Sequence, residues 1–205
     1  MTIRILPWWT DQAVTFIEGF IDQTRHIRPL FFEFGGGNST IFFLEKGVEL
    51  ITIEHDREWL GKIESIISML PSRANATLEL ASRPYHKKIF SIKDKILDRF
   101  VVIVVDGRDR VKCIESSIAF CQSYNVPHLL ILDNSERLAN EYAEAKPFLK
   151  RMYQKFYHFE QPSWVVDRRL IPLPDRSGWL APHRWITSVY FSSGSADFST
   201  AGRLL

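Results

Sequence analysis

The segment that spans residues 30–56 constrains the fold of this chain more than any other part of the sequence. An apolar stretch, residues 30–34, runs into three consecutive glycines and then into polar residues that can begin a helix. A second apolar stretch, residues 49–53, is followed by Glu54. Glycine permits a positive φ and lets a ligand approach the main chain, and an acidic residue that ends the next strand can accept hydrogen bonds from ribose hydroxyls. The segment therefore predicts a β-α-β unit that binds a ribose.

Two classes of cofactor use such a unit, and the residues of the glycine loop discriminate between them. The dinucleotide fingerprint G-x-G-x-x-G needs a third glycine for close helix packing, but Thr40 stands there after Gly35 and Gly37. Glu33 precedes Gly35 by two residues, which gives the order E-x-G-x-G. A carboxylate beside the loop suits an amino-acid ammonium better than a pyrophosphate. The pattern favours S-adenosylmethionine, and a NAD-type protein of similar fold is the alternative.

Short polar motifs stand at intervals along the chain. They are Pro7-Trp8, EFGGGNST at residues 33–40, EHD at 54–56, VDGRDR at 105–110, LDNSER at 132–137 and WITS at 185–188. The glycine loop with Glu33, followed by Glu54 and Asp106, resembles the class I S-adenosylmethionine-dependent methyltransferases, and the full set is similar to a small branch of that superfamily. The likeness covers residues 7–191. It implies an α/β, Rossmann-like doubly wound sheet of seven strands, mostly parallel, with helices on both faces and an antiparallel last strand.

Composition and charge narrow the class of protein. The chain has 205 residues, of which 45% are apolar and 13% aromatic, enough to build one core of ordinary size. A net charge of +2 is too small to argue for a nucleic-acid partner, which normally needs a concentrated basic face. The longest uninterrupted apolar run, residues 100–105, is far shorter than a membrane span. We expect a cytoplasmic enzyme that acts on a small-molecule or polar acceptor, without a membrane or nucleic-acid partner.

The apolar pattern alternates between strand-like runs and helix-like stripes. Strands are predicted at residues 30–34, 49–54, 76–81, 100–105, 128–132, 157–161 and 187–191. Helices are predicted to begin near residues 11, 39, 57 and 111, with a short helix near 92–97 and a longer one over 137–156 that restarts at Pro147. This order predicts a doubly wound sheet whose ligands bind at the carboxyl ends of the strands. We expect a single domain, residues 1–205, with an N-terminal helix (1–29), a cofactor-binding core (30–161), a Pro/Trp-rich loop (162–186) and a last strand with its tail (187–205).

The loops after the first three strands carry most of the residues expected to bind the cofactor. Glu33 and residues 35–39 are expected to hold the methionine part, with main-chain donors at the helix start facing its carboxylate. Glu54 is expected to bind the ribose, and the turn after the third strand is expected to face the adenine. The expected cofactor-binding residues are Glu33, Gly35, Gly36, Gly37, Asn38, Ser39, Glu54, His55, Ser82, Arg83 and Asp106. The alternative for the glycine loop is a purely structural turn.

Charged residues cluster after the fourth and fifth predicted strands, beside the expected position of the reacting methyl group. Asp106, Asp109 and Asp133 are the candidate bases that would remove a proton from a hydroxyl acceptor. The expected substrate contacts are Arg108, Arg110, Asn134 and Trp185. The alternative for the first of these clusters is a capped helix start in which neighbouring arginines offset Asp109.

Three of these oxygen-bearing residues could also hold a divalent metal ion. Asp106, Asp133 and Asn134 end neighbouring strands, and oxygen ligands suit magnesium, calcium or manganese. The arrangement resembles the metal-dependent O-methyltransferases such as the catechol enzyme, but the lysine that follows the first aspartate in that family is missing. We expect S-adenosylmethionine-dependent methyl transfer to oxygen. The alternative from a different class is a regulatory protein that binds the cofactor without catalysis.

Overall fold

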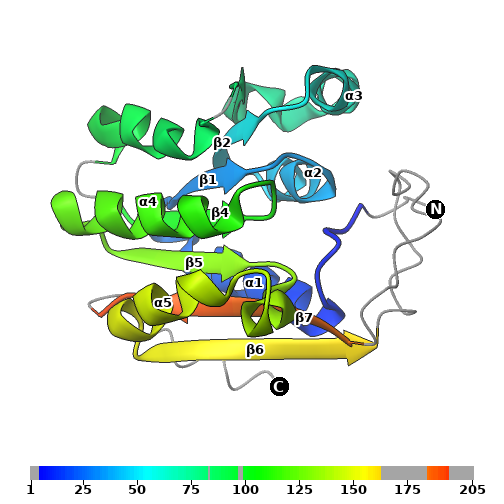
Figure 1. Ribbon diagram of the computed structural model, residues 1–205. Coiled ribbons are helices and arrows are strands. Elements are labelled where there is room, and N and C mark those ends of the chain that lie inside the picture. The colour runs from blue at the N-terminus through cyan, green and yellow to red at the C-terminus, as the bar shows by residue number, and fades with distance from the viewer. Residues whose placement is uncertain (1–4, 83, 97–98, 163–183, 194–205) are drawn as a thin grey trace.

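The protein is built on one seven-stranded sheet with the strand order β3-β2-β1-β4-β5-β7-β6 (Figure 1). The computed structural model describes residues 5–82, 84–96, 99–162 and 184–193. The strands are β1 (Leu30–Phe34), β2 (Glu49–Glu54), β3 (Ala76–Leu80), β4 (Val101–Val105), β5 (His128–Leu132), β6 (Lys155–Pro162) and β7 (Arg184–Phe191). Strands β1 to β5 pair in parallel, whereas β7 is antiparallel to both β5 and β6. The predicted doubly wound sheet with an antiparallel last strand is confirmed.

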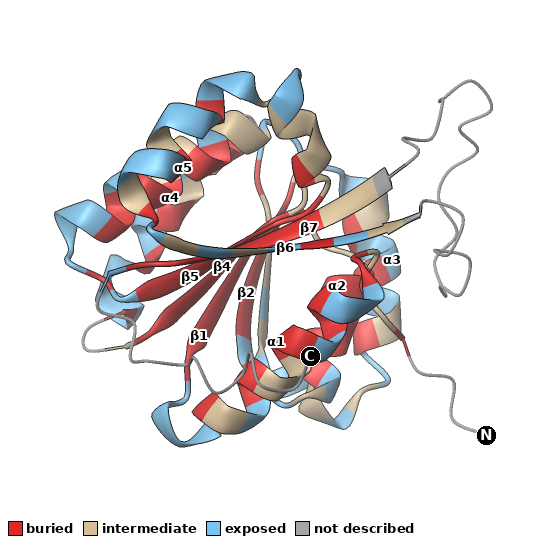
Figure 2. Cartoon of the chain, turned by 90° about the horizontal axis from the view of Figure 1, so that it is seen from below, coloured by how far each residue is buried: buried red, intermediate tan, exposed pale blue. Residues whose placement is uncertain are grey.

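Helices cover both faces of the sheet, as Figure 2 shows. One face carries α1 (Asp11–Thr24), α2 (Asn38–Glu45) and α3 (Arg57–Ile67), and the other carries α4 (Arg110–Ser123) and α5 (Lys146–Met152). Short 3-10 segments span Arg25–Ile27, Pro71–Asn75, Tyr85–Lys95, Ser135–Ala139 and Ala143–Ala145. The side chains of Thr10 and Asp56 cap α1 and α3 as predicted. No helix in the described part of the chain is both long and apolar enough to cross a membrane.

The sandwiched sheet explains why its central strands are apolar apart from Glu33 in β1 and His128 in β5. All five residues of β4 and all five of β5 are buried, because each strand presents alternate side chains to the helices on the two faces. The result is two apolar clusters, one on each side of the sheet. Because β1 pairs with both β2 and β4, the loops after these three strands leave the same edge.

Three predictions of local structure are wrong. The first part of the helix expected over residues 137–156 is instead two 3-10 segments, because Asn134 adopts a left-handed φ of 52°. The expected restart at Pro147 is confirmed by α5, which ends at Met152 rather than near residue 156. The short helix expected near residues 92–97 is a 3-10 segment that begins at Tyr85. The loop expected at residues 162–186 is shorter at both ends, since Pro162 and residues 184–186 lie in β6 and β7. Residues 163–183, which hold the rest of that loop, lie outside the described residues.

The loops after β1 and β4 meet through two glycines. Gly35 has a φ of 89°, which favours glycine, and its main chain packs against that of Gly107. A Cβ atom on Gly107 would lie 2.9 Å from the Cα atom of Gly35 and 2.8 Å from the hydroxyl of Tyr85. A side chain at either glycine would therefore separate the two loops.

We expect Gly35→Ala to destabilise the protein more than Gly47→Ala. Both glycines have a positive φ, 89° and 74°, but a Cβ at Gly47 meets no atom within 4 Å. Gly47→Ala should therefore lower the free energy of unfolding only by the cost of placing alanine in a left-handed conformation, about 1 kcal/mol. Gly35→Ala should cost about 2 kcal/mol more, because the loops must also part. Urea unfolding of both variants measures the difference, and equal losses would contradict the loop contact.

Candidate functional site

The polar residues of interest gather at the carboxyl edge of the sheet. The carbonyl of Ile53 at the end of β2 accepts a hydrogen bond from the amide of Gly35 (2.9 Å), and the carbonyl of Phe34 accepts one from the amide of Asp106 (3.1 Å). The amide of Asp133 reaches the carbonyl of Val105 at 3.4 Å. The loops that follow β1, β4 and β5 are thereby held side by side, at the edge where doubly wound sheets bind their ligands.

Glu33 lies inside the fold and is surrounded by hydroxyl groups. Its side chain has no exposed surface, and Oε2 accepts hydrogen bonds from Thr40 (2.6 Å) and Thr52 (2.8 Å). Ser39 donates to Oε1. Burial raises the pKa of Glu33 to about 7, although the three hydroxyl bonds act in the opposite direction. Glu33 therefore fixes the start of α2 on β2, and its carboxyl group is shielded from the space above the loop.

Glu54 joins the end of β2 to the glycine loop. Its side chain is 3% exposed, and Oε2 accepts a hydrogen bond from the amide of Gly36 at 3.0 Å. Oε1 accepts hydrogen bonds from the amides of His55 (2.7 Å) and Asp56 (2.9 Å). Each carboxylate oxygen offers two lone pairs, so Oε2 keeps one acceptor position after the bond to Gly36. In this arrangement Glu54 can accept one further hydroxyl hydrogen bond at Oε2.

Asn38 is a buried side chain at this edge whose polar atoms are unsatisfied among the described residues. It is the first residue of α2 and is 4% exposed, yet neither Nδ2 nor Oδ1 has a hydrogen-bond partner among the described residues. Buried polar groups are almost always paired, because an unmade hydrogen bond costs the full desolvation of the group. A ligand group that both accepts from and donates to the amide would satisfy Asn38. The methionine part of the expected cofactor offers a carboxylate and an ammonium.

An aromatic pair stands beside Glu54. The imidazole of His55 stacks on the ring of Tyr85 with centroids 5.7 Å apart and an angle of 13° between the planes. Tyr85 is buried, and its hydroxyl donates to the carbonyl of Arg108, so the ring ties the 3-10 segment after β3 to the loop after β4. Ser82 is exposed between this segment and β3. Arg83, the other residue expected near the adenine, lies outside the described residues.

Asp106 is held by a cation on one side and an indole on the other. Nη2 of Arg110 lies 3.0 Å from Oδ1, and the indole N–H of Trp9 donates to Oδ2 at 3.4 Å. The side chain of Asp106 is 21% exposed. The guanidinium of Arg110 also donates to the carbonyls of Asp106, Gly107 and Asp133, so all three of its nitrogens bond to the chain itself. Arg110, expected to bind the substrate, is therefore committed to joining the loops after β4 and β5.

Asp133 is the more deeply buried of the two aspartates. The indole N–H of Trp185 lies 3.1 Å and 3.3 Å from its two oxygens, and the hydroxyl of Thr187 donates to Oδ1 at 2.8 Å. Burial raises the pKa of Asp133 well above its usual range, and the charge of Asp106 raises it further, whereas Arg110 and the two hydrogen bonds lower it. The two aspartates therefore share one site, and Asp106 is the one that solvent reaches.

The other expected acceptor-side residues have different positions. Arg108 and Asp109 are exposed, and Asp109 begins α4 with a left-handed φ of 51° and no side-chain capping bond. Asn134 is half-buried with a φ of 52°. Among the described residues, no group of three or more His, Cys, Asp or Glu side chains is placed to hold a metal ion. The positive charge beside Asp106 and Asp133 is Arg110, so the residues present do not fit the metal site expected from the sequence.

Three residues that complete this site were not predicted as site residues. Trp9 is fully buried although it precedes α1, and Thr52 and Thr187 are buried hydroxyls within β2 and β7. For Thr52 the signal was a polar residue between apolar neighbours in β2, whereas β7 also carries Arg184 and Ser188, so no such pattern marked Thr187. For Trp9 the signal was a tryptophan pair beside the first helix cap, since an indole N–H normally has a partner when it is buried.

Comparison with solved structures shows the fold of class I methyltransferases. The O-methyltransferase TomG from Streptomyces achromogenes, solved with S-adenosylmethionine and involved in tomaymycin synthesis, is 11% identical with a TM-score of 0.56, over 87% of this chain and 79% of its own. The C-terminal domain of precorrin-6Y C5,15-methyltransferase from Rhodobacter capsulatus is 12% identical with a TM-score of 0.50, over 82% and 85% of the two chains. No protein-family model matches the chain, and a sequence search of curated proteins finds no match.

We expect the stability of the protein to fall as the pH rises through the titration of Glu33. A carboxyl group whose pKa is raised from 4.5 to about 7 binds more protons in the folded than in the unfolded state between these values. Stability is therefore lost as the pH rises from 4.5 to 7, by about 3 kcal/mol for this group alone. Glu33→Gln should remove that part of the pH dependence.

Urea unfolding of both proteins between pH 4.5 and 8 measures the effect as a difference between two curves. The other buried acids make the same contribution to the pH dependence of stability in the wild type and in Glu33→Gln, so their contributions cancel in the difference. Glu58→Gln, at a side chain that is 84% exposed, is the matched control. Parallel curves for the wild type and Glu33→Gln would contradict the interpretation.

Proposed function

We propose that this protein binds S-adenosylmethionine at the carboxyl edge of its sheet and transfers the methyl group to an oxygen atom of a small or polar acceptor. The observation that carries the proposal is the contact between Gly36 and Glu54. These residues come from the loop after β1 and the end of β2, and they meet at 3.0 Å. The glycine turn and the acidic strand end therefore belong to one site, as a shared adenosine requires.

The residues at this edge fit the parts of such a cofactor. Asn38, buried without a partner at the start of α2, would bind the methionine carboxylate or ammonium. Glu54 would accept a ribose hydroxyl at Oε2, and the imidazole of His55 would lie against the adenine. Glu33 would act indirectly, because its three hydroxyl bonds hold the loop while its carboxyl group has no exposed surface.

Asp106 is the residue that we assign to the acceptor. When bound, S-adenosylmethionine supplies a methyl group on a positively charged sulfur. The protein must align a nucleophile with that group and, for a hydroxyl acceptor, remove its proton. Asp106 reaches solvent and is oriented by Trp9 and Arg110, so it can act as that base. Asp133, enclosed by Trp185 and Thr187, would position this pair of loops.

An oxygen acceptor is favoured by the acids at this edge and by the motif after β4. Enzymes that methylate base amines carry an N-P-P-Y type of motif there, whereas this chain has residues 106–109 with the sequence DGRD. TomG, whose fold is similar, is named an O-methyltransferase, while the precorrin enzyme is named for positions C5 and C15. The fold is therefore compatible with several acceptor atoms, and the carboxylates carry the preference for a hydroxyl.

We expect Glu54→Gln to weaken the binding of S-adenosylhomocysteine by about tenfold or more, because a charge-assisted hydrogen bond to the ribose is lost. Titration calorimetry of the wild type and the variant measures the affinity, and unfolding curves check that the variant is folded. Glu58→Gln, at an exposed position on α3, should bind like the wild type. Unchanged affinity in Glu54→Gln, or tighter binding of NAD than of S-adenosylhomocysteine, would refute the proposed site.

We expect Asp106→Asn to slow methyl transfer by about a hundredfold, with the affinity for S-adenosylhomocysteine within about threefold of the wild type. Asparagine keeps the size of the side chain and one acceptor oxygen, which can still accept from Arg110, but it cannot take a proton. Release of S-adenosylhomocysteine with panels of hydroxyl and amine acceptors measures the reaction. Wild-type rates in the variant would contradict the role of Asp106. Cofactor binding without turnover on any acceptor would instead favour the regulatory alternative.

A further inference from the structure

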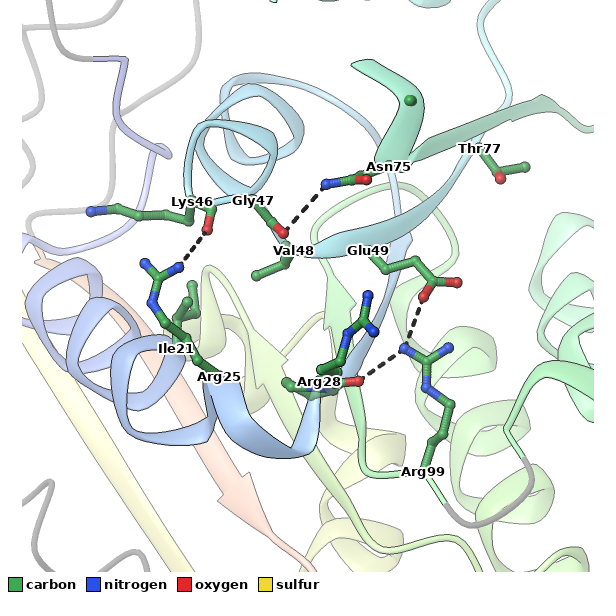
Figure 3. A pocket seen from close by; sticks show the side chains of 12 residues that line it. Ile21, Arg25, Arg28, Lys46, Gly47, Val48, Glu49, Asn75, Thr77 and Arg99 are labelled. Atoms are coloured by element: carbon green, nitrogen blue, oxygen red, sulfur yellow. Dashed lines mark hydrogen bonds and ion pairs between the residues drawn. The ribbon is translucent and has the colours of Figure 1, made fainter. Parts of the chain in front are cut away.

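A cavity of about 340 Å³ lies at the amino ends of the strands, at the opposite edge of the sheet from the site described above (Figure 3). The end of α1, the end of α2, and the residues that precede or begin β1, β2, β3 and β4 form its walls. It is lined by Ile21, Arg25, Arg28, Pro29, Lys46, Gly47, Val48, Glu49, Ala74, Asn75, Thr77 and Arg99. Seven of these twelve residues, Arg28 among them, are exposed, so the space is an open hollow in the surface that is large enough for a small molecule.

The charged side chains of this cavity are mostly basic. Four cations and one carboxylate line it. Lys46 lies 2.6 Å from Glu18, Arg25 lies 3.0 Å from Asp22, and Arg99 lies 2.9 Å from Glu49. Arg28 is the remaining cation, and no hydrogen bond or ion pair joins its guanidinium to another residue in the described part of the chain. The cavity therefore has an excess of positive charge at Arg28.

Arg28 is held in a conformation that arginine rarely adopts. Its φ is 48°, in the left-handed region, and the following residue is Pro29, which disfavours helical conformations in the residue before it. The amide of Arg28 donates to the carbonyl of Arg25 (3.3 Å), and its carbonyl accepts from Arg99 (2.9 Å). Glycine or asparagine would form this turn at less cost. An arginine here, with its side chain lining the cavity, indicates a role beyond closing the turn.

Arg99 lines the same cavity, and its two side-chain hydrogen bonds use only one of its three nitrogens. A single nitrogen, Nη2, bonds both the carbonyl of Arg28 and the carboxylate of Glu49. Figure 3 shows Arg28 and Arg99 extending towards the same part of the cavity, beside Glu49. Arginine binds phosphate through paired N–H donors, so Arg28 and Arg99 supply this cavity with the donor chemistry of a phosphate site.

The carboxyl ends of two helices, α1 and α2, lie at this cavity, and each places a partial negative charge there. The carboxyl terminus of α2 carries a partial negative charge, but its carbonyls already have donors. The carbonyl of Lys46 accepts from Arg25 at 3.4 Å, and that of Gly47 accepts from the amide of Asn75 at 3.4 Å. The side chains that line the cavity carry four positive charges and one negative charge.

We propose that this cavity binds the phosphate group of a phosphorylated small molecule, with Arg28 and Arg99 as the recognition residues and Asn75 and Thr77 as polar contacts for the remainder of the ligand. The proposal is independent of methyl transfer, because none of these residues belongs to the carboxyl edge. It assigns to the protein a second ligand site on the opposite side of the same sheet.

Titration calorimetry of the full chain at fixed ionic strength tests the proposal with pyrophosphate and ribose 5-phosphate, and with ribose as the control ligand. Arg28→Gly should weaken binding of both phosphate compounds by about tenfold or more, since charged hydrogen bonds are lost. Arg28→Lys should fall between this variant and the wild type, because lysine retains the charge without the planar fork. Arg57→Ala, an exposed arginine on α3, should bind like the wild type.

Arg28→Gly also separates loss of the site from loss of the fold. Glycine suits the left-handed conformation, so the variant should be at least as stable as the wild type in urea. Its affinity for S-adenosylhomocysteine should be unchanged. Equal phosphate affinity in Arg28→Gly and the wild type would overturn the proposal. So would ribose binding as tightly as ribose 5-phosphate, or association with polyanions such as RNA but not with either phosphate compound.

Discussion

A carboxyl group buried without a cation sets the geometry on which the candidate site depends. Glu33 has no exposed surface, and burying an unpaired charge is costly unless hydrogen bonds compensate. The three hydroxyls that satisfy it come from two elements, Thr52 on β2 and both Ser39 and Thr40 on α2. These bonds fix where α2 starts relative to β2, and so they fix the glycine loop between Glu33 and the helix. The contact of that loop with Glu54 follows from this placement.

The sequence predicted the sheet well because continuous apolar runs have one interpretation when both faces are covered. The bounds of β1, β2 and β5 agree with the prediction, and the caps of α1 and α3 were readable from Thr10 and Asp56. The prediction for the segment after β5 was wrong. The path of this segment depends on the left-handed conformation of Asn134, which no local sequence pattern indicates. Asparagine tolerates that conformation without requiring it, so the turn is decided by tertiary contacts. One such contact is the bond of Ser135 to the carbonyl of Ile186 in β7 (3.1 Å).

The sequence also indicated which charged residues stand at the carboxyl edge, but not how each one is satisfied. Whether an aspartate faces solvent depends on partners far away along the chain. Trp9 reaches Asp106 across 97 positions, and Trp185 reaches Asp133 across 52. Arg110 was expected to contact the substrate, but three carbonyl groups and one carboxylate instead hold it between two loops. Such assignments need the fold, because they depend on the direction of a side chain rather than on its type.

The balance of charge at the carboxyl edge bears on which cofactor the proposed site suits. Asp106 and Glu54 are carboxylates, and Arg110 is the cation that contacts this group. Burial raises the pKa of both Asp133 and Glu33, so each holds its proton more readily than an exposed carboxyl group does. The remaining balance is negative. A negative site attracts a sulfonium and an ammonium and repels a pyrophosphate, which usually relies on the N-terminus of a helix and on further cations. The charges of the folded protein therefore favour S-adenosylmethionine over NAD, as does the missing third glycine at Thr40.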